Sequence, residues 1–168
     1  SNTISVIDTT KNIVVSMVNT GKSPTGVSVS PDGKKVYVTN YGDKTVSIID
    51  TGTKSITGTI SVGKGPREIA VNPSGTKVYV VNSDSGSISV IDTVKNTVTS
   101  TVKVEGVPFG VAVSPDGKKA YVTSSDKYTS TVSVIDTSAN KVTARIPIGS
   151  NPAGIAVTPD GKKVYVAI

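Results

Sequence analysis

The residues of this sequence with the clearest potential for chemistry are aspartates that recur at regular spacing. One set is Asp8, Asp50, Asp92 and Asp136, and a second set is Asp32, Asp116 and Asp160. Carboxylates could bind a metal ion or transfer protons. The first set, however, ends apolar segments and the second stands in Pro-Asp-Gly triplets, where an aspartate accepts hydrogen bonds from backbone amides two residues ahead. We therefore expect these aspartates to stabilise turns, and we expect no metal site.

Histidine and cysteine are both absent from the 168 residues. Their absence removes the commonest general base, the thiol nucleophile and the zinc–thiolate site. On these residue types we expect that the protein is not an enzyme, that it has no catalytic residues and that it needs no cofactor.

The aspartates belong to a longer repeat that covers the whole chain. A Tyr-Val motif begins at Tyr37, Tyr79, Tyr121 and Tyr165, at intervals of 42, 42 and 44 residues. The proline of the turn triplet recurs in the same register, and so does a second proline at positions 24, 66, 108 and 152. A fixed period of this length is typical of repeat architectures, in which each copy packs on its neighbours.

Each copy predicts four short strands, which the second copy illustrates. Residues 68–71, 77–81, 87–91 and 97–104 are rich in Val, Ile, Thr and Ser, and they are separated by turn residues. Four strands with a period in the low forties indicate one blade of a β-propeller. We expect an all-β propeller with the first strand of each blade at the axis and the Thr-rich fourth strand at the outer rim.

The motifs resemble a known family. Ser-Pro-Asp-Gly-Lys-Lys-Val-Tyr-Val-Thr-Asn at residues 30–40 and Ser-Val-Ile-Asp-Thr at residues 89–93 are similar to the YVTN β-propeller repeat of archaeal surface-layer and surface-antigen proteins. The resemblance covers the whole chain and rests on turn and core positions. It implies a cell-surface structural role, and better-known members of that family are seven-bladed.

The order of motifs divides the chain into one propeller domain, residues 1–168, with three full blades at 22–63, 64–105 and 106–149. Residues 1–21 match the outer half of a blade and residues 150–168 the inner half. We expect residues 163–166 to pair with residues 3–7 and to close the ring by this two-plus-two strand seam. Closure gives a four-bladed monomer, which needs about 90° between blades, or an eight-bladed homodimer, which needs about 45°.

Positions that depart from the repeat are the candidate binding residues. Loops before the first strand and between strands two and three lie on one face of a propeller, where ligands bind near the channel mouth. Glu68 replaces a glycine found in the other three copies, and Phe109 is the only phenylalanine. The candidate ligand- or partner-binding residues are Lys22, Tyr41, Lys64, Arg67, Glu68, Asp84, Phe109, Lys127 and Tyr128.

From these observations we expect an extracellular, non-enzymatic cell-surface module that binds protein or glycan through this loop face. No apolar run is long enough to span a membrane, and no signal peptide is visible in the chain. Two alternatives stay open. The net charge of +6 would suit a nucleic acid or another polyanion, although the lysines are spread around the ring. A propeller enzyme, such as a lactonase or a quinoprotein-like dehydrogenase, is the other alternative.

Overall fold

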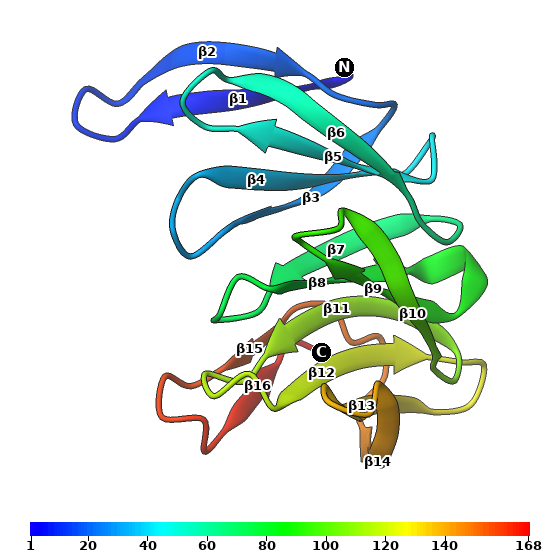
Figure 1. The fold of residues 1–168 in the computed structure, drawn as a ribbon. Coiled ribbons are helices and arrows are strands. Elements are labelled where there is room, and N and C mark those ends of the chain that lie inside the picture. The colour runs from blue at the N-terminus through cyan, green and yellow to red at the C-terminus, as the bar shows by residue number, and fades with distance from the viewer.

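The computed structural model describes all 168 residues as sixteen strands joined by short turns (Figure 1). The strands hold 58% of the residues, and the one helical element is a three-residue 3₁₀ turn, which confirms the all-β prediction. The strands are β1 (Thr3–Asp8), β2 (Ile13–Asn19), β3 (Pro24–Val29), β4 (Lys35–Asn40), β5 (Thr45–Asp50), β6 (Ser55–Ser61), β7 (Pro66–Val71), β8 (Lys77–Asn82), β9 (Ser87–Asp92), β10 (Thr97–Lys103), β11 (Val107–Val113), β12 (Lys119–Ser125), β13 (Ser130–Asp136), β14 (Lys141–Ile148), β15 (Ile155–Val157) and β16 (Val164–Val166), and the 3₁₀ turn is η1 (Ser83–Ser85). No helix of the structure could cross a membrane.

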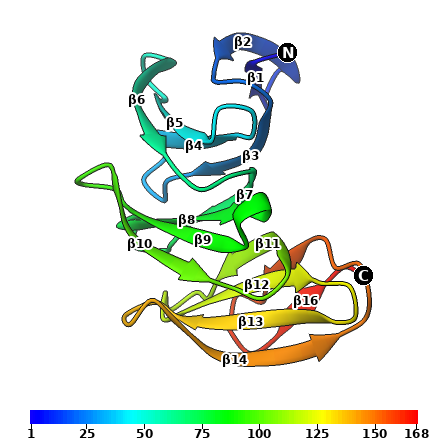
Figure 2. The same cartoon turned by 90° about the vertical axis from the view of Figure 1, so that its right-hand side faces the viewer.

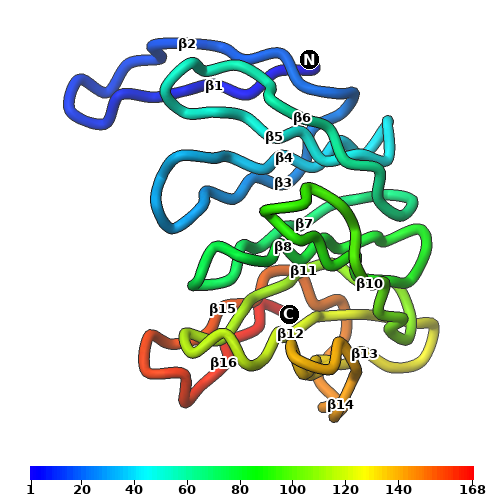
Figure 3. Tube along the Cα trace, viewed as in Figure 1, coloured from blue at the N-terminus to red at the C-terminus, as the bar shows by residue number.

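The strands form three complete antiparallel sheets, each a simple meander of four consecutive strands. The sheets are β3 to β6, β7 to β10 and β11 to β14. Strands β1 and β2 form a two-stranded sheet before them, and β15 and β16 form another after them. The sheets follow one another in chain order along the trace, as blades of a propeller do (Figure 3). The first strands β3, β7, β11 and β15 contact one another in succession, so they form the inner wall of the arc.

The expected seam between residues 3–7 and 163–166 does not form within the chain. Strand β1 pairs with β2 alone, and β16 pairs with β15 alone. Figures 1 and 2 place these two small sheets at different ends of the row of blades. The four-bladed closed monomer is therefore wrong, and the chain is an open arc. Successive blades turn too little about the axis for four repeats to bring β16 back to β1 (Figures 1 and 2). An eight-bladed ring of two copies stays a prediction.

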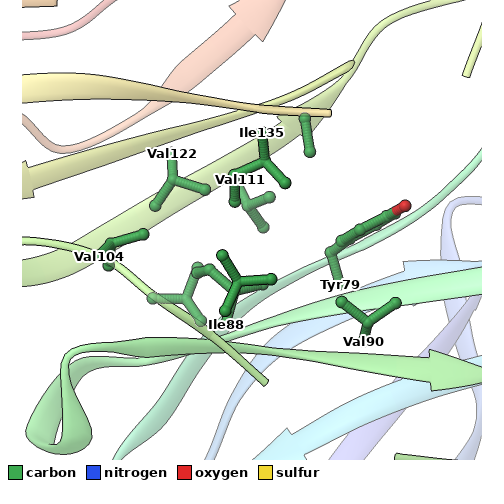
Figure 4. Close-up of a cluster of buried hydrophobic side chains, with 10 residues drawn as sticks. Tyr79, Ile88, Val90, Val104, Val111, Val122 and Ile135 are labelled. Carbon is green, nitrogen blue, oxygen red and sulfur yellow. The ribbon is translucent and has the colours of Figure 1, made fainter. Parts of the chain in front are cut away.

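The core consists of layers of apolar side chains between successive sheets. Between the second and third blades, Tyr79, Ile88 and Val90 pack against Val111 and Ile135 (Figure 4). All of these side chains are less than a tenth exposed. The central strand β9 directs Ile88 and Val90 into the core shared with the third blade. Its other face carries the small Ser87 and Ser89 together with Ile91, which belongs to the core shared with the first blade, so neighbouring blades pack on both faces.

The recurring tyrosine has the inter-blade role that we expected in two copies. Tyr37 and Tyr79 are almost completely buried between blades, and burial raises the pKa of both phenols above 10.0. Tyr121 is half-buried, and Tyr165, on the last strand, is 62% exposed. The same repeat position is therefore core or surface according to whether another blade covers it.

Candidate binding site at the axis of the propeller

The recurring aspartates have the turn-stabilising role that the sequence predicts. The Asp92 carboxylate accepts hydrogen bonds from the amides of Val94 and Lys95, at 2.9 and 2.8 Å. In the other set, Asp32 accepts from the Ser30 hydroxyl at 2.6 Å and from the Lys34 amide at 3.1 Å. The Lys95 amide holds the pKa of Asp92 below 3.8, and the Ser30 hydroxyl does the same for Asp32. No group of three acidic side chains in the structure converges on a point where a metal ion could bind.

The inner strand of each complete blade carries an irregularity at the same repeat position. In β3, β7 and β11 the register shifts just after the first proline, so that two residues oppose one residue of the next strand. The paired residues are Thr25 and Gly26, Arg67 and Glu68, and Phe109 and Gly110. A bulge of this kind bends the strand and can direct both side chains toward one side. The bulges therefore present consecutive residues to the propeller axis.

These bulges build a hollow of about 330 Å³ at the inner wall of the arc. All four repeats contribute the same columns to its lining, which consists of Thr25, Arg67, Glu68, Phe109, Ala153 and Gly154. Arg67 and Glu68 are exposed, and they are the only charged residues of the lining. The hollow thus combines one cation, one carboxylate and one aromatic ring.

In the first blade a threonine and a glycine keep the inner wall closed. The Gly26 amide donates to the Thr39 hydroxyl at 2.7 Å, and that hydroxyl donates to the backbone carbonyl of Arg67 at 2.5 Å. A Cβ atom at Gly26 would overlap the Arg67 carbonyl oxygen. The third blade has the same link: the Thr123 hydroxyl accepts a hydrogen bond from the Gly110 amide at 2.9 Å and donates one to the backbone carbonyl of Ala153 at 3.2 Å.

The second blade has neither the threonine nor the glycine that form this hydrogen-bonded link. Val81 stands where the other two blades have threonine, and Glu68 stands where they have glycine. Valine cannot form the polar link, and the Ser83 hydroxyl instead holds the next blade by donating to the carbonyl of Pro108 at 2.6 Å. The substitution thus brings a carboxylate to the axis while a different hydrogen bond joins the blades.

The two charged side chains of the hollow have no ionic partner. The one ion pair of the structure joins Arg145 to Glu105, at 3.3 Å on the outer surface. The Arg67 guanidinium lies 5.2 Å from the centre of the Tyr41 ring, within the range of a cation–π contact. The Tyr41 hydroxyl donates to the Asp84 carboxylate at 3.0 Å. Arg67 therefore keeps its charge available to an anion.

The structure groups the nine predicted site residues in three ways. Arg67, Glu68 and Phe109 line the axial hollow, and Tyr41 and Asp84 lie beside them through the contacts just described. Lys127 and Tyr128 line a separate hollow of about 300 Å³, with the lysine ammonium 5.3 Å from the tyrosine ring centre. The side chains of Lys22 and Lys64 are exposed and line neither hollow; their amides bond to Asp43 and Ser85.

Sequence reasoning missed Thr25, Ala153 and Gly154 as lining residues. The signal was present, because these residues occupy the same repeat columns as Arg67 and Glu68. Candidate residues were chosen because they depart from the repeat, and this criterion does not select residues that conform to it.

Comparison with known proteins decides the family. Residues 2–113 match the family model described as lactonase, 7-bladed β-propeller. The chain belongs to this lactonase family. Residues 71–168 also match the model of the cytochrome D1 heme domain, so the two models overlap on residues 71–113 of this lactonase-family chain, from the end of β7 to the end of β11. Among proteins of curated function, none matches the chain.

Two solved structures resemble this lactonase-family arc over part of their own length. Hydrazine synthase of Kuenenia stuttgartiensis is 29% identical with a TM-score of 0.94, over 98% of this chain and 49% of that one. A putative 6-phosphogluconolactonase from Bacteroides uniformis is 17% identical with a TM-score of 0.83, over 99% of this chain and 57% of that one. The chain therefore spans about half the length of the structures it resembles.

These matches correct two expectations from the sequence. They show a propeller, but the families are the lactonase and the cytochrome D1 heme domain rather than the YVTN surface-layer repeat. The expectation that the protein is not an enzyme is wrong, because both families point to enzymatic or heme-binding propellers. The absence of histidine and cysteine removes two common catalytic residue types, but carboxylates and lysines can also act as general acids and bases.

The lining of the axial hollow holds none of the side chains that usually bind a heme iron. Histidine, cysteine and methionine are common axial ligands, and the chain has neither histidine nor cysteine. Its single methionine, Met17, is 69% exposed on strand β2, away from the hollow. Tyrosine is a further ligand type, but the hydroxyl of Tyr41, beside the hollow, is bonded to Asp84. The exposed Tyr128 and Tyr165 do not line the hollow.

Proposed function

We propose that this chain is the part of a lactonase-type propeller enzyme that carries its substrate site, and that the site is the axial hollow. The observation that carries the proposal is the pair Arg67 and Glu68, exposed and without ionic partners in a hollow built by all four repeats. The family match supports the reaction class. The substrate class is a small lactone with an anionic group, because the only cation of the lining is an arginine with a free guanidinium.

Hydrolysis of a lactone adds water to the ring carbonyl and breaks the ring C–O bond, giving a hydroxy acid. The Glu68 carboxylate acts as general base: it takes a proton from the attacking water and returns it to the alkoxide that leaves the ring carbonyl. The Arg67 guanidinium binds the anionic group of the substrate and adds positive potential where the carbonyl oxygen gains negative charge. Phe109 supplies an apolar wall for the carbon ring of the substrate.

The test is hydrolysis of glucono-δ-lactone and its 6-phosphate, followed by acid release in a pH-stat. We expect Glu68→Gln to lower kcat by about 10²-fold or more, the usual contribution of a general base. Arg67→Ala should raise KM for the phosphorylated lactone more than for the neutral one. The matched controls are Glu105→Gln and Arg145→Ala, which change the only other glutamate and arginine at an exposed surface ion pair.

A second variant separates catalysis from the fold. Glu68→Gly restores the residue found at this column in the other three copies, so the blade should keep its stability while turnover is lost. Turnover of the unaltered chain no faster than spontaneous hydrolysis, or equal turnover by Glu68→Gln, contradicts the proposal. The expected cell-surface location and the expected protein or glycan partner of the loop face stay predictions.

A further inference from the structure

We infer that Tyr41, held by Asp84, positions the Arg67 guanidinium at the axial hollow and thereby sets the affinity of the site for anions. The inference rests on the proposed function in one respect, the role of Arg67 as the anion-binding group. Tyr41 and Asp84 are positioning residues, since neither lines the hollow itself.

The three residues come from different segments of two neighbouring blades. Tyr41 follows β4 in the first blade, whereas Arg67 lies in the bulge of β7 and Asp84 in the turn η1 of the second blade. The Tyr41 amide donates to the carbonyl of Ser23 at 3.0 Å, which fixes the start of the side chain. Its hydroxyl donates to Asp84 at 3.0 Å, which fixes the far end. A ring held at both ends is a rigid platform for the guanidinium 5.2 Å from its centre.

The second blade makes a specific place for the Asp84 side chain. Gly65 has a φ of +65°, and a Cβ atom there would lie 2.5 to 2.8 Å from the carboxylate atoms of Asp84. The Asp84 amide donates to the carbonyl of Lys64 at 3.1 Å, so the turn is tied back to the same loop. A glycine at 65 is therefore required both by the backbone conformation and by the carboxylate packed over it.

Comparison with the next repeat shows that this use of the aspartate is particular to the second blade. Asp126 occupies the corresponding column, and its carboxylate accepts from the amides of Tyr128 and Thr129, both at 2.7 Å. It thus stabilises its own loop. The Asp84 carboxylate accepts no bond from its own loop and accepts the Tyr41 hydroxyl from the neighbouring blade instead.

The arrangement orients Arg67 without neutralising it. A direct Arg67–Asp84 ion pair would remove the positive charge from the hollow, but no such pair exists. Asp84 holds the Tyr41 ring through the hydroxyl hydrogen bond, and the ring in turn orients the Arg67 guanidinium through the cation–π contact. Arginine otherwise loses much rotational freedom when it binds an anion, and a platform that restricts it beforehand increases affinity.

The experiment measures the affinity for inorganic phosphate by calorimetry, together with the NMR signal of the Arg67 side-chain Nε–H group. Tyr41→Leu removes the ring and should weaken phosphate binding about fivefold, the size expected for one cation–π contact. Tyr41→Phe keeps the ring and Asp84→Ala keeps the hydroxyl, so each should give a smaller loss of about twofold. Because both break the same hydrogen bond, the double variant should be no weaker than either single one. Tyr165→Leu, an exposed tyrosine outside the hollow, is the matched control.

The lactone assay adds a readout that simple loss of stability would not produce. Tyr41→Leu should raise KM for the phosphorylated lactone more than for the neutral one, because only the phosphorylated lactone has the anionic group that Arg67 binds. It should also shift the Arg67 Nε–H signal. Phosphate affinity and an Arg67 signal equal to those of the unaltered chain would overturn the inference. If Arg67→Ala binds phosphate normally, the anion-binding role of the proposed function fails instead, and the Arg67 signal of Tyr41→Leu still reports whether the ring orients the guanidinium.

Discussion

The Thr39 hydroxyl of the first blade donates a hydrogen bond to the backbone carbonyl of Arg67 in the second blade, 2.5 Å away. The same oxygen accepts from the Gly26 amide at 2.7 Å. One buried side chain therefore closes the inner wall between two blades and fixes the backbone of a residue that lines the axial hollow.

Replacing Thr39 with valine should destabilise the protein and disturb the hollow. Valine has the same shape but leaves the buried Gly26 amide without an acceptor, which costs about 1–3 kcal/mol. Urea unfolding followed by circular dichroism would measure the loss. Thr59→Val on the exposed outer strand β6 is the control and should change stability by less than about 0.5 kcal/mol. Equal stability of the two variants would show that the Thr39 link contributes nothing.

Glycine at position 26 should be intolerant of even one added methyl group. A Cβ atom at Gly26 would overlap the backbone carbonyl oxygen of Arg67, and backbone cannot move aside as a flexible side chain can. We expect Gly26→Ala to cost about 1–3 kcal/mol and to lower phosphate affinity by displacing Arg67. Gly154→Ala is the matched change in the same column, where nothing lies within 4 Å, and it should be neutral. Thermal unfolding of both variants tests this difference.

The core between blades should dominate stability over the outer loops. Ile91 is completely buried between the first and second blades, whereas Val94, three residues later, is 84% exposed. Ile91→Ala should lower the free energy of unfolding by about 2–5 kcal/mol through lost burial and the cavity it leaves. Val94→Ala should have almost no effect. A chain that loses as much stability from Val94→Ala would indicate that the loop takes part in a contact beyond this chain.

Acid should destabilise the fold through the turn aspartates. Hydrogen bonds hold their pKa values below the ordinary 3.8; these residues are Asp8, Asp32, Asp50, Asp92, Asp116, Asp126, Asp136 and Asp160. The unfolded chain then binds more protons than the folded chain near pH 3.8. The stabilisation is complete above about pH 5 and is lost as the pH falls through 3.8 and below. Melting temperatures between pH 7 and pH 2.5 measure it, and Asp92→Asn should flatten the curve.

Much of the fold followed from local features of the sequence. The 42-residue period, the Pro-Asp-Gly triplets and the alternation of Val and Ile predicted four-stranded blades, and the role of Asp92 and its equivalents followed from turn chemistry. These features were readable because turns and strands depend on residues close together in the chain. Arg67, Glu68 and Phe109 could be selected for the same reason, since a departure from a repeat is visible without coordinates.

Only the tertiary structure decides which of these candidate residues contact one another. The bulge in β7 directs Arg67 and Glu68 to one hollow, and packing of two blades brings Tyr41 between Arg67 and Asp84. The pattern also could not show that the row of blades stays open, because pairing of β1 with β16 depends on the angle between successive sheets. That angle is set by how side chains interlock across each interface, which is a property of surfaces in contact and not of residues in sequence.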